Sequence, residues 1–229
     1  MVSTPTTTSA SPQEVWPGLG LCEPELPVLL RFPPDTPLSD KLLEQISRLN
    51  KPWRFERTAT GDLIIMAPAG NDADEISIEL GRQLLNWVRE TRAGGVTTGS
   101  SGGYVRGDGH LAAPDAAWTS PQRRASLSEE QLEETFQPIS PTFVIEVRSG
   151  SDTVAAQRRK MEAWVAGGAE LGWLVVPENE TVYVYRPGEQ TQVLDRPDRL
   201  SAEPVCEGLT IDFEFVWNLN VGRMPGNAE

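Results

Sequence analysis

The sequence predicts an α/β fold in which helices flank one mixed central β-sheet. Three observations support this fold class. Helical patterns of apolar residues recur near residues 39–49, 72–88 and 153–166. Short apolar runs bounded by turn residues, which are typical of strands, fill much of the chain between and after them. The order helix, several strands, helix, strand then fits a single sheet covered by helices.

Length and composition indicate one domain with a tail. The chain has 229 residues, of which 38% are hydrophobic, and this suffices for one sizeable core. Residues 1–20 are rich in Thr, Ser and Pro, so we expect a disordered tail there and a single domain over 21–229. We find no apolar run of membrane-spanning length and no secretory signal. We therefore expect a cytoplasmic protein in which Cys22 and Cys206 are reduced.

The first half of the predicted domain contains a helix, a hairpin and a second helix. Ser39 is a suitable N-cap for the helix that ends near residue 49. A turn signal at 60–62 joins strands expected at 53–58 and 62–67. Acidic residues at 72–75 begin the second helix, which carries its apolar residues on one face to Val88. Two glycines at 94 and 95 end it.

Strands dominate the second half. Short strands are expected near 96–98 and 103–106, followed by one that begins at Asp115. The polar segment 121–136 is expected to be a surface excursion, with a helix start at Ser128. A strand around Glu146, a helix over 153–166, a fully apolar strand at 171–176 and an exposed strand at 181–186 follow. Weaker strands are expected near Val193 and Ile211.

The side-chain inventory excludes several kinds of catalytic site. The only histidine is His110, so an HExxH metal site is ruled out and a Ser/His/Asp triad would have no choice of base. The sequence also contains no clustered Cys/His zinc site. His110 lies in a polar, Gly-rich stretch, where we expect a solvated loop histidine. The net charge of −13 argues against a protein that coats DNA generally, although a nuclease with a locally basic cleft or a bound metal remains compatible with it.

Two carboxylates interrupt apolar runs that read as buried strands. Asp115 follows a proline at the start of one run, and Glu146 lies inside another. An ionised carboxylate in such a strand is costly unless it is paired or binds a metal. Two of them on neighbouring strands would suit Mg²⁺ or Mn²⁺, which prefer hard oxygen ligands. The alternatives are a turn aspartate at 115 and a surface-facing glutamate at 146.

Lys160 is the third candidate catalytic residue. In the helix over 153–166 it shares one stripe with Gln157 and Trp164, so its ammonium could be directed toward the two carboxylates. The alternative is a lysine whose stem packs on Trp164. Together, Asp115, Glu146 and Lys160 fit a metal-assisted hydrolase of phosphodiesters. On the premise that Lys160 is exposed, its replacement by alanine is expected to change stability by less than about 1 kcal/mol.

The order of these motifs resembles the PD-(D/E)XK nuclease superfamily. The closer resemblance is to its bacterial Uma-type branch, the DUF820-like putative restriction endonucleases, and it covers roughly residues 38–217. The matching segments are MAPAG at 66–70, APDAAW at 113–118, PTFVIEVRS at 141–149, KMEAW at 160–164, GWLV at 172–175 and VYVYRPG at 182–188. The resemblance implies a restriction-endonuclease-like fold.

The resemblance also implies roles for individual residues. Asp115 and Glu146 would ligate the metal, with the backbone carbonyl of Val147 as a further ligand. The superfamily's lysine two residues after the glutamate is replaced by Arg148, which is too basic to act as a general base. Lys160 would take its place from the following helix, and Arg148 would be a phosphate or structural contact. Near the start of the first long helix, where many members carry His or Arg-Asn, Glu75 could serve as an outer metal ligand.

We therefore expect a Mg²⁺- or Mn²⁺-dependent endonuclease that acts on DNA, with a homodimer as the way to cut both strands. The first alternative is a catalytically weak or inactive nuclease-fold protein that serves as a binding or regulatory module. The second is a metal-dependent hydrolase of another phosphoester. A nuclease should carry a basic groove beside the carboxylates, built from residues such as Arg106, Arg148, Arg158 or Arg159, whereas a protein-binding module should carry an apolar patch there.

Overall fold

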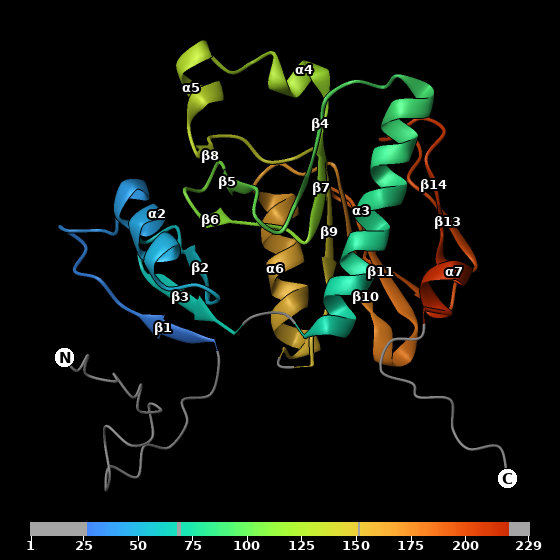
Figure 1. The fold of residues 1–229 in the computed structure, drawn as a ribbon, viewed down its shortest axis with the longest axis horizontal. Helices are drawn as coiled ribbons and strands as arrows, with labels where there is room; N and C mark the ends of the chain where they lie inside the picture. The colour runs from blue at the N-terminus through green and yellow to red at the C-terminus, as the bar shows by residue number, and fades with distance from the viewer. Residues whose placement is uncertain (1–26, 68–69, 151, 220–229) are drawn as a thin grey trace, which may run out of the picture.

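Over the residues that the structure describes, the chain forms two six-stranded β-sheets, a two-stranded sheet and flanking helices (Figure 1). The structure is a computed structural model that describes residues 27–67, 70–150 and 152–219. The first sheet has the order β1-β3-β2-β6-β5-β8. Its strands are β1 (Val28–Leu30), β2 (Arg54–Arg57), β3 (Leu63–Met66), β5 (Gly103–Val105), β6 (Leu111–Ala112) and β8 (Phe136–Gln137).

The second sheet carries the apolar strands predicted from the sequence, in the order β12-β11-β10-β9-β7-β4. These strands are β4 (Val96–Gly99), β7 (Ala116–Thr119), β9 (Phe143–Val147), β10 (Leu171–Val176), β11 (Thr181–Tyr185) and β12 (Gln192–Asp195). The strands β9 and β10 are parallel, and helix α6 (Val154–Ala166) lies between them in the chain. Every residue of both strands is buried, because helices cover both faces of this sheet.

The two faces of β9 belong to different cores. Phe143, Ile145 and Val147 pack in one cluster with residues of the long helix α3 (Asn71–Thr91). Val144 packs in another cluster with Met161 and Trp164 of α6. Because side chains alternate along a strand, Glu146 projects to the same face as Val144, toward α6. This alternation decides which helix the carboxylate meets.

A smaller core supports the first sheet. Helix α2 (Asp40–Leu49) begins where Ser39 Oγ accepts a hydrogen bond from the backbone N–H of Leu42, and it buries Leu43 fully. The turn between β2 and β3 is closed by a 2.9 Å hydrogen bond from Thr58 N to Asp62 O. Gly61 in this turn has φ 87°, a conformation that favours glycine. The predicted hairpin is thus confirmed.

The α/β class with mixed sheets flanked by helices is confirmed, and the three main helices lie where the apolar periodicity placed them. The expectation of one sheet is incomplete, because the hairpin and the strand at 103–105 belong to the first sheet. The strand at 181–185 was expected to be exposed, but Val182, Val184 and Tyr185 are buried because β11 lies between β10 and β12.

Several short elements have no clear sequence signal. The unpredicted elements include β1, β6, β8, β13 (Arg199–Ser201) and α7 (Phe213–Trp217). The strand expected near Ile211 is β14 (Thr210–Asp212), which pairs with β13. The excursion at 121–136 contains α4 (Pro121–Arg124) and α5 (Glu129–Glu133). The capping box at Ser128 confirms the helix start that was predicted there.

The predicted disordered tail at 1–20 and Cys22 lie outside the described residues, and the single domain over 21–229 stays a prediction.

Cys206 is buried and has a free thiol, and burial raises its pKa to about 12. Within the described ranges, no helix is both long and apolar enough to cross a membrane.

Candidate active site

The structure brings Asp115 and Glu146 together on one face of the second sheet. The antiparallel register pairs Ala116 with Ile145 and Ala117 with Val144, and its continuation by one residue sets Asp115 opposite Glu146. The backbone N–H of Val147 donates to Asp115 Oδ2 at 2.9 Å. Asp115 is 9% exposed and Glu146 is 1% exposed. The alternative of a surface glutamate is therefore wrong. Asp115 does lie at a bend directly before β7, but its carboxylate reaches across to β9 and does not cap its own loop.

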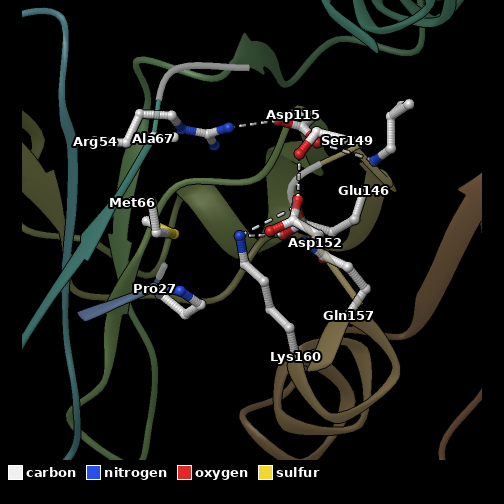
Figure 2. A pocket seen from close by; sticks show the side chains of 11 residues that line it. Pro27, Arg54, Met66, Ala67, Asp115, Glu146, Ser149, Asp152, Gln157 and Lys160 are labelled. Atoms are coloured by element: carbon white, nitrogen blue, oxygen red, sulfur yellow. Dashed lines mark hydrogen bonds and ion pairs between the residues drawn. The ribbon is translucent and has the colours of Figure 1, made fainter. Parts of the chain in front are cut away.

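Helix α6 presents Lys160 and Trp164 to the same carboxylate. Lys160 Nζ lies 3.1 Å from Glu146 Oε1, and the Trp164 indole N–H donates to the same oxygen at 2.8 Å. The two side chains are four residues apart on the helix, which places them on one stripe. The ammonium of Lys160 thus points to the carboxylates, as the sequence predicted. The alternative, a lysine whose stem packs on Trp164, does not exclude this, because both side chains lie on the same stripe of α6. Figure 2 shows Lys160 reaching up from α6 to Glu146.

Sequence reasoning missed Glu56, which reaches the site from the first sheet. It lies on β2, is 4% exposed, and its Oε1 is 2.9 Å from Lys160 Nζ. Its Oε2 is 3.8 Å from His110 Nε2, so the prediction of a solvated loop histidine is wrong. The local sequence RFER reads as an ordinary polar strand, and only the approach of the first sheet to α6 reveals the role of Glu56.

Arg54, two residues earlier on β2, was also missed. Its Nη1 lies 3.3 Å from Asp115 Oδ1, and Figure 2 shows the guanidinium pointing at that carboxylate. Residues at i and i+2 of a strand project to the same side, so Arg54 and Glu56 enter the site together. The period-two spacing of two charged residues on this strand is the signal that could have found them.

A small cavity of about 30 Å³ lies between these charges, which is room for about two water molecules. Its lining includes Ser149, Asp152 and Gln157, none of which was predicted to be functional. Ser149 Oγ donates to Asp152 Oδ2 at 2.6 Å. Gln157 Oε1 is buried and accepts no hydrogen bond from any residue the structure describes. The complete lining is Pro27, Arg54, Met66, Ala67, Asp115, Glu146, Val147, Ser149, Asp152, Gln157 and Lys160.

The charges of the site shift one another's pKa values. Burial raises the pKa of Glu146 to about 7, with Asp115 and Glu56 acting in the same direction and Lys160 opposing them. Burial also acts to raise the pKa of Glu56, but Lys160 and His110 outweigh it and lower that pKa to about 2. For Lys160, the nearby Glu146 and Glu56 carboxylates outweigh burial and raise the pKa above its usual range. Lys160 is therefore an ammonium at neutral pH.

The donor set fits a divalent cation such as Mg²⁺. Asp115 and Glu146 offer hard carboxylate oxygens, and Val147, whose carbonyl is the expected third ligand, also lines the cavity. Across the described ranges, no three His, Cys, Asp or Glu side chains are arranged as a metal site. Mg²⁺ commonly uses one or two carboxylates and completes its shell with water and substrate oxygens, so this open set suits it. Glu75 is exposed on α3 and does not line the cavity, so it is not an outer ligand here.

The arginines expected to form a basic groove are occupied elsewhere. Arg106 is buried, pairs with Asp108 at 2.8 Å and stacks over Trp164, while Arg158 stacks over Tyr183. Arg148 pairs with Glu178 and donates to the backbone carbonyl of Asp152 at 2.9 Å, which makes it a structural contact. Arg159 is exposed and does not line the cavity. The expectation of a basic groove from these residues is therefore wrong, and the cations that line the cavity are Arg54 and Lys160.

Comparison with known proteins identifies similar folds and families. The model of the family described as "Uma2: Putative restriction endonuclease" matches residues 40–214. The chain is also similar to the crystal structure of a putative nuclease belonging to DUF820 from Anabaena variabilis ATCC 29413, with 22% identity and a TM-score of 0.64. That similarity covers 76% of this chain and 96% of the other, and it shows a shared fold. A search of curated proteins gives no match.

Proposed function

The chain belongs to the Uma2 family of putative restriction endonucleases, and we propose that it is a Mg²⁺-dependent endonuclease that hydrolyses DNA phosphodiester bonds. The observation that carries this proposal is the pair of buried carboxylates, Asp115 directly before β7 and Glu146 on the neighbouring β9, with Lys160 at hydrogen-bond distance from Glu146. Cutting both strands of a duplex needs two such sites, which a homodimer would supply. The absence of a membrane-spanning helix in the described residues is compatible with the cytoplasmic location that we propose.

Asp115, Glu146 and the backbone carbonyl of Val147 would hold the cation. When bound, the cation would lower the pKa of a water molecule and neutralise charge that develops on the phosphate. The chain's own residues prepare for this chemistry. Trp164 fixes the orientation of the Glu146 carboxylate by its indole hydrogen bond, and the Val147 N–H fixes that of Asp115. The two carboxylates are thereby held in place before substrate binds.

Lys160 acts as a donor in this proposal. Its raised pKa keeps it protonated, so it stabilises negative charge and orients a water molecule or a phosphate oxygen. Arg54 is 26% exposed at its side chain and stands next to Asp115, where it can donate to a phosphate oxygen. These two side chains are the cations that line the cavity, in a chain of net charge −13.

The test is cleavage of supercoiled plasmid and of single-stranded DNA by the purified protein with Mg²⁺, Mn²⁺ or EDTA. We expect nicked or linear products with either metal and none in EDTA, and no products from Asp115→Asn or Glu146→Gln. Cleavage that persists in EDTA would overturn the metal mechanism. Cleavage by both variants at the rate of the natural protein would show that another site is responsible.

One observation favours the alternative of a nuclease-fold binding module without cleavage. Both cations of the cavity are already paired with its carboxylates, Arg54 with Asp115 and Lys160 with Glu146 and Glu56. Such pairing balances charge in the absence of a metal. A protein that binds DNA but leaves every phosphodiester substrate intact in the presence of Mg²⁺ and Mn²⁺ would support this alternative. Hydrolysis of a small phosphodiester without cleavage of DNA would instead support the other alternative, a metal-dependent hydrolase of another phosphoester.

A further inference from the structure

A second hollow of about 490 Å³ lies beside the site cavity. The two share Arg54 and Met66, and the larger hollow also contains Glu56. Its walls come from the end of α2, the start of β2 and the turn between β4 and β5. We call it the Trp53 groove after the residue at its wall. A ligand in this groove would lie next to the carboxylates where the proposed chemistry occurs.

Trp53 is unusually accessible for this protein. It is 44% exposed, whereas the other tryptophans in the described ranges are at most 9% exposed. Large aromatic side chains are normally well covered, so an accessible indole on the wall of a groove next to an active site calls for a partner. Phe136 of β8 also lines the groove. A flat, accessible aromatic side chain is the feature on which proteins stack unpaired nucleobases.

The groove also carries positive charge that is free to meet a phosphate. Arg48 and Lys51 line it, are exposed, and form no ion pair with any residue in the described ranges. Glu44 is an exposed carboxylate that lines the same groove and partly offsets them. The hydroxyls of Ser100 and Ser101 lie on the wall and can donate to phosphate or sugar oxygens.

We infer that the Trp53 groove binds a single-stranded segment of nucleic acid, with an unpaired base stacked on Trp53 and phosphates against Arg48 and Lys51. The inference rests on the proposed function and assigns a substrate class to it. Bases in a duplex are stacked on one another, and a side chain on a groove wall reaches a base face only where pairing is interrupted. The preferred substrate is then single-stranded DNA or a junction between single and double strands.

The test measures binding without cleavage, by fluorescence anisotropy of a labelled oligothymidylate in EDTA at low salt. We expect the single strand to bind more tightly than a duplex of the same length. Trp53→Ala should weaken binding about 5- to 150-fold, the range for the loss of one stacked base, while Trp53→Phe should retain most of it. Leu49→Ala is the matched control, because Leu49 is 77% exposed nearby but does not line the groove. The double variant Arg48→Ala, Lys51→Ala should weaken binding and reduce its salt dependence.

Unchanged affinity of a folded Trp53→Ala variant would overturn the inference, as would equal or tighter binding of the duplex. If Trp53→Ala instead disrupts a dimer in sedimentation and leaves oligonucleotide affinity unchanged, a second copy of the chain covers the groove and the inference is wrong. Binding that depends on Trp53 without any cleavage in Mg²⁺ or Mn²⁺ would refute the proposed nuclease and leave the groove assignment standing. Metal-dependent cleavage together with oligonucleotide binding that Trp53→Ala does not change would refute the groove assignment and leave the proposed nuclease standing.

Discussion

Glu56 and Lys160 form a buried ion pair of 2.9 Å that joins the first sheet to the helix covering the second. The same ammonium lies 3.1 Å from Glu146, so one lysine balances carboxylates from both sheets. The charges of the candidate site therefore also hold the two halves of the fold together.

Lys160→Ala should destabilise the fold on the order of 3–5 kcal/mol, because it leaves two buried carboxylates without their partner. The expectation of less than about 1 kcal/mol assumed an exposed lysine, and it is wrong because the Lys160 side chain is only 16% exposed and paired twice. Urea unfolding measures the difference. Arg159→Ala, on the exposed side of the same helix, is the control and should stay within about 0.5 kcal/mol. Equally small changes in unfolding free energy for both variants would show that the ion pairs of Lys160 contribute little to stability.

On the proposed mechanism, Asp115→Asn and Glu146→Gln should each reduce DNA cleavage at least about 100-fold, because each would remove a charged ligand of the proposed cation. Glu75→Gln should retain the natural rate, since Glu75 is exposed and does not line the cavity. Initial rates of plasmid nicking at saturating Mg²⁺ decide the matter. If Glu75→Gln loses as much activity as the other two variants, Glu75 takes part in metal binding and its exclusion from the metal site is wrong.

Arg54→Ala should strengthen binding of Mg²⁺ or Mn²⁺ to the free protein by about 5-fold, because Arg54 lies 3.3 Å from Asp115 and repels a second cation there. Titration calorimetry with Mn²⁺ measures this affinity without requiring catalysis. Arg57→Ala is a control from the same strand, since Arg57 pairs with Asp40 outside the cavity. Metal affinity that falls in Arg54→Ala would show that Arg54 organises the ligands and does not compete with the metal.

Glu56 should make the protein sensitive to acid. Its pKa in the folded protein is about 2, below the ordinary value of 4.5, so it stabilises the fold fully above pH 4.5 and this contribution is lost as the pH falls toward 2. The shift corresponds to roughly 3 kcal/mol. The difference in unfolding free energy between the natural protein and Glu56→Gln should therefore shrink as the pH is lowered from 6 to 3 in urea titrations. A difference that stays constant over this range would contradict the assigned pairing with Lys160.

Local signals account for the parts of the structure that the sequence predicted. Ser39 and Thr153 cap helices through hydrogen bonds to backbone groups three residues away, and such short-range patterns are legible in the chain. Asp115 and Glu146 could be found because a carboxylate within an apolar run is rare and costly. Their partners Glu56 and Arg54 are harder to find, since the period-two spacing of two charges on a polar strand gains its meaning only when the first sheet packs against α6. The two-residue strands β6 and β8 likewise exist through long-range pairing and not through local preference.

The dual use of Lys160 and Glu56 has an evolutionary consequence. A relative of this chain would lose stability if it lost the lysine, whether or not it cleaves DNA, so purifying selection on folding alone would preserve the Lys160–Glu56 pair. Survival of the Asp–Glu–Lys constellation in a relative is therefore a poor marker of surviving catalysis. Gln157 and Trp53 are more informative, because Gln157 Oε1 has no hydrogen-bond partner in the described chain and Trp53 is exposed. Substitution at these two positions would therefore say more about a change in the proposed substrate site than substitution of Lys160 would.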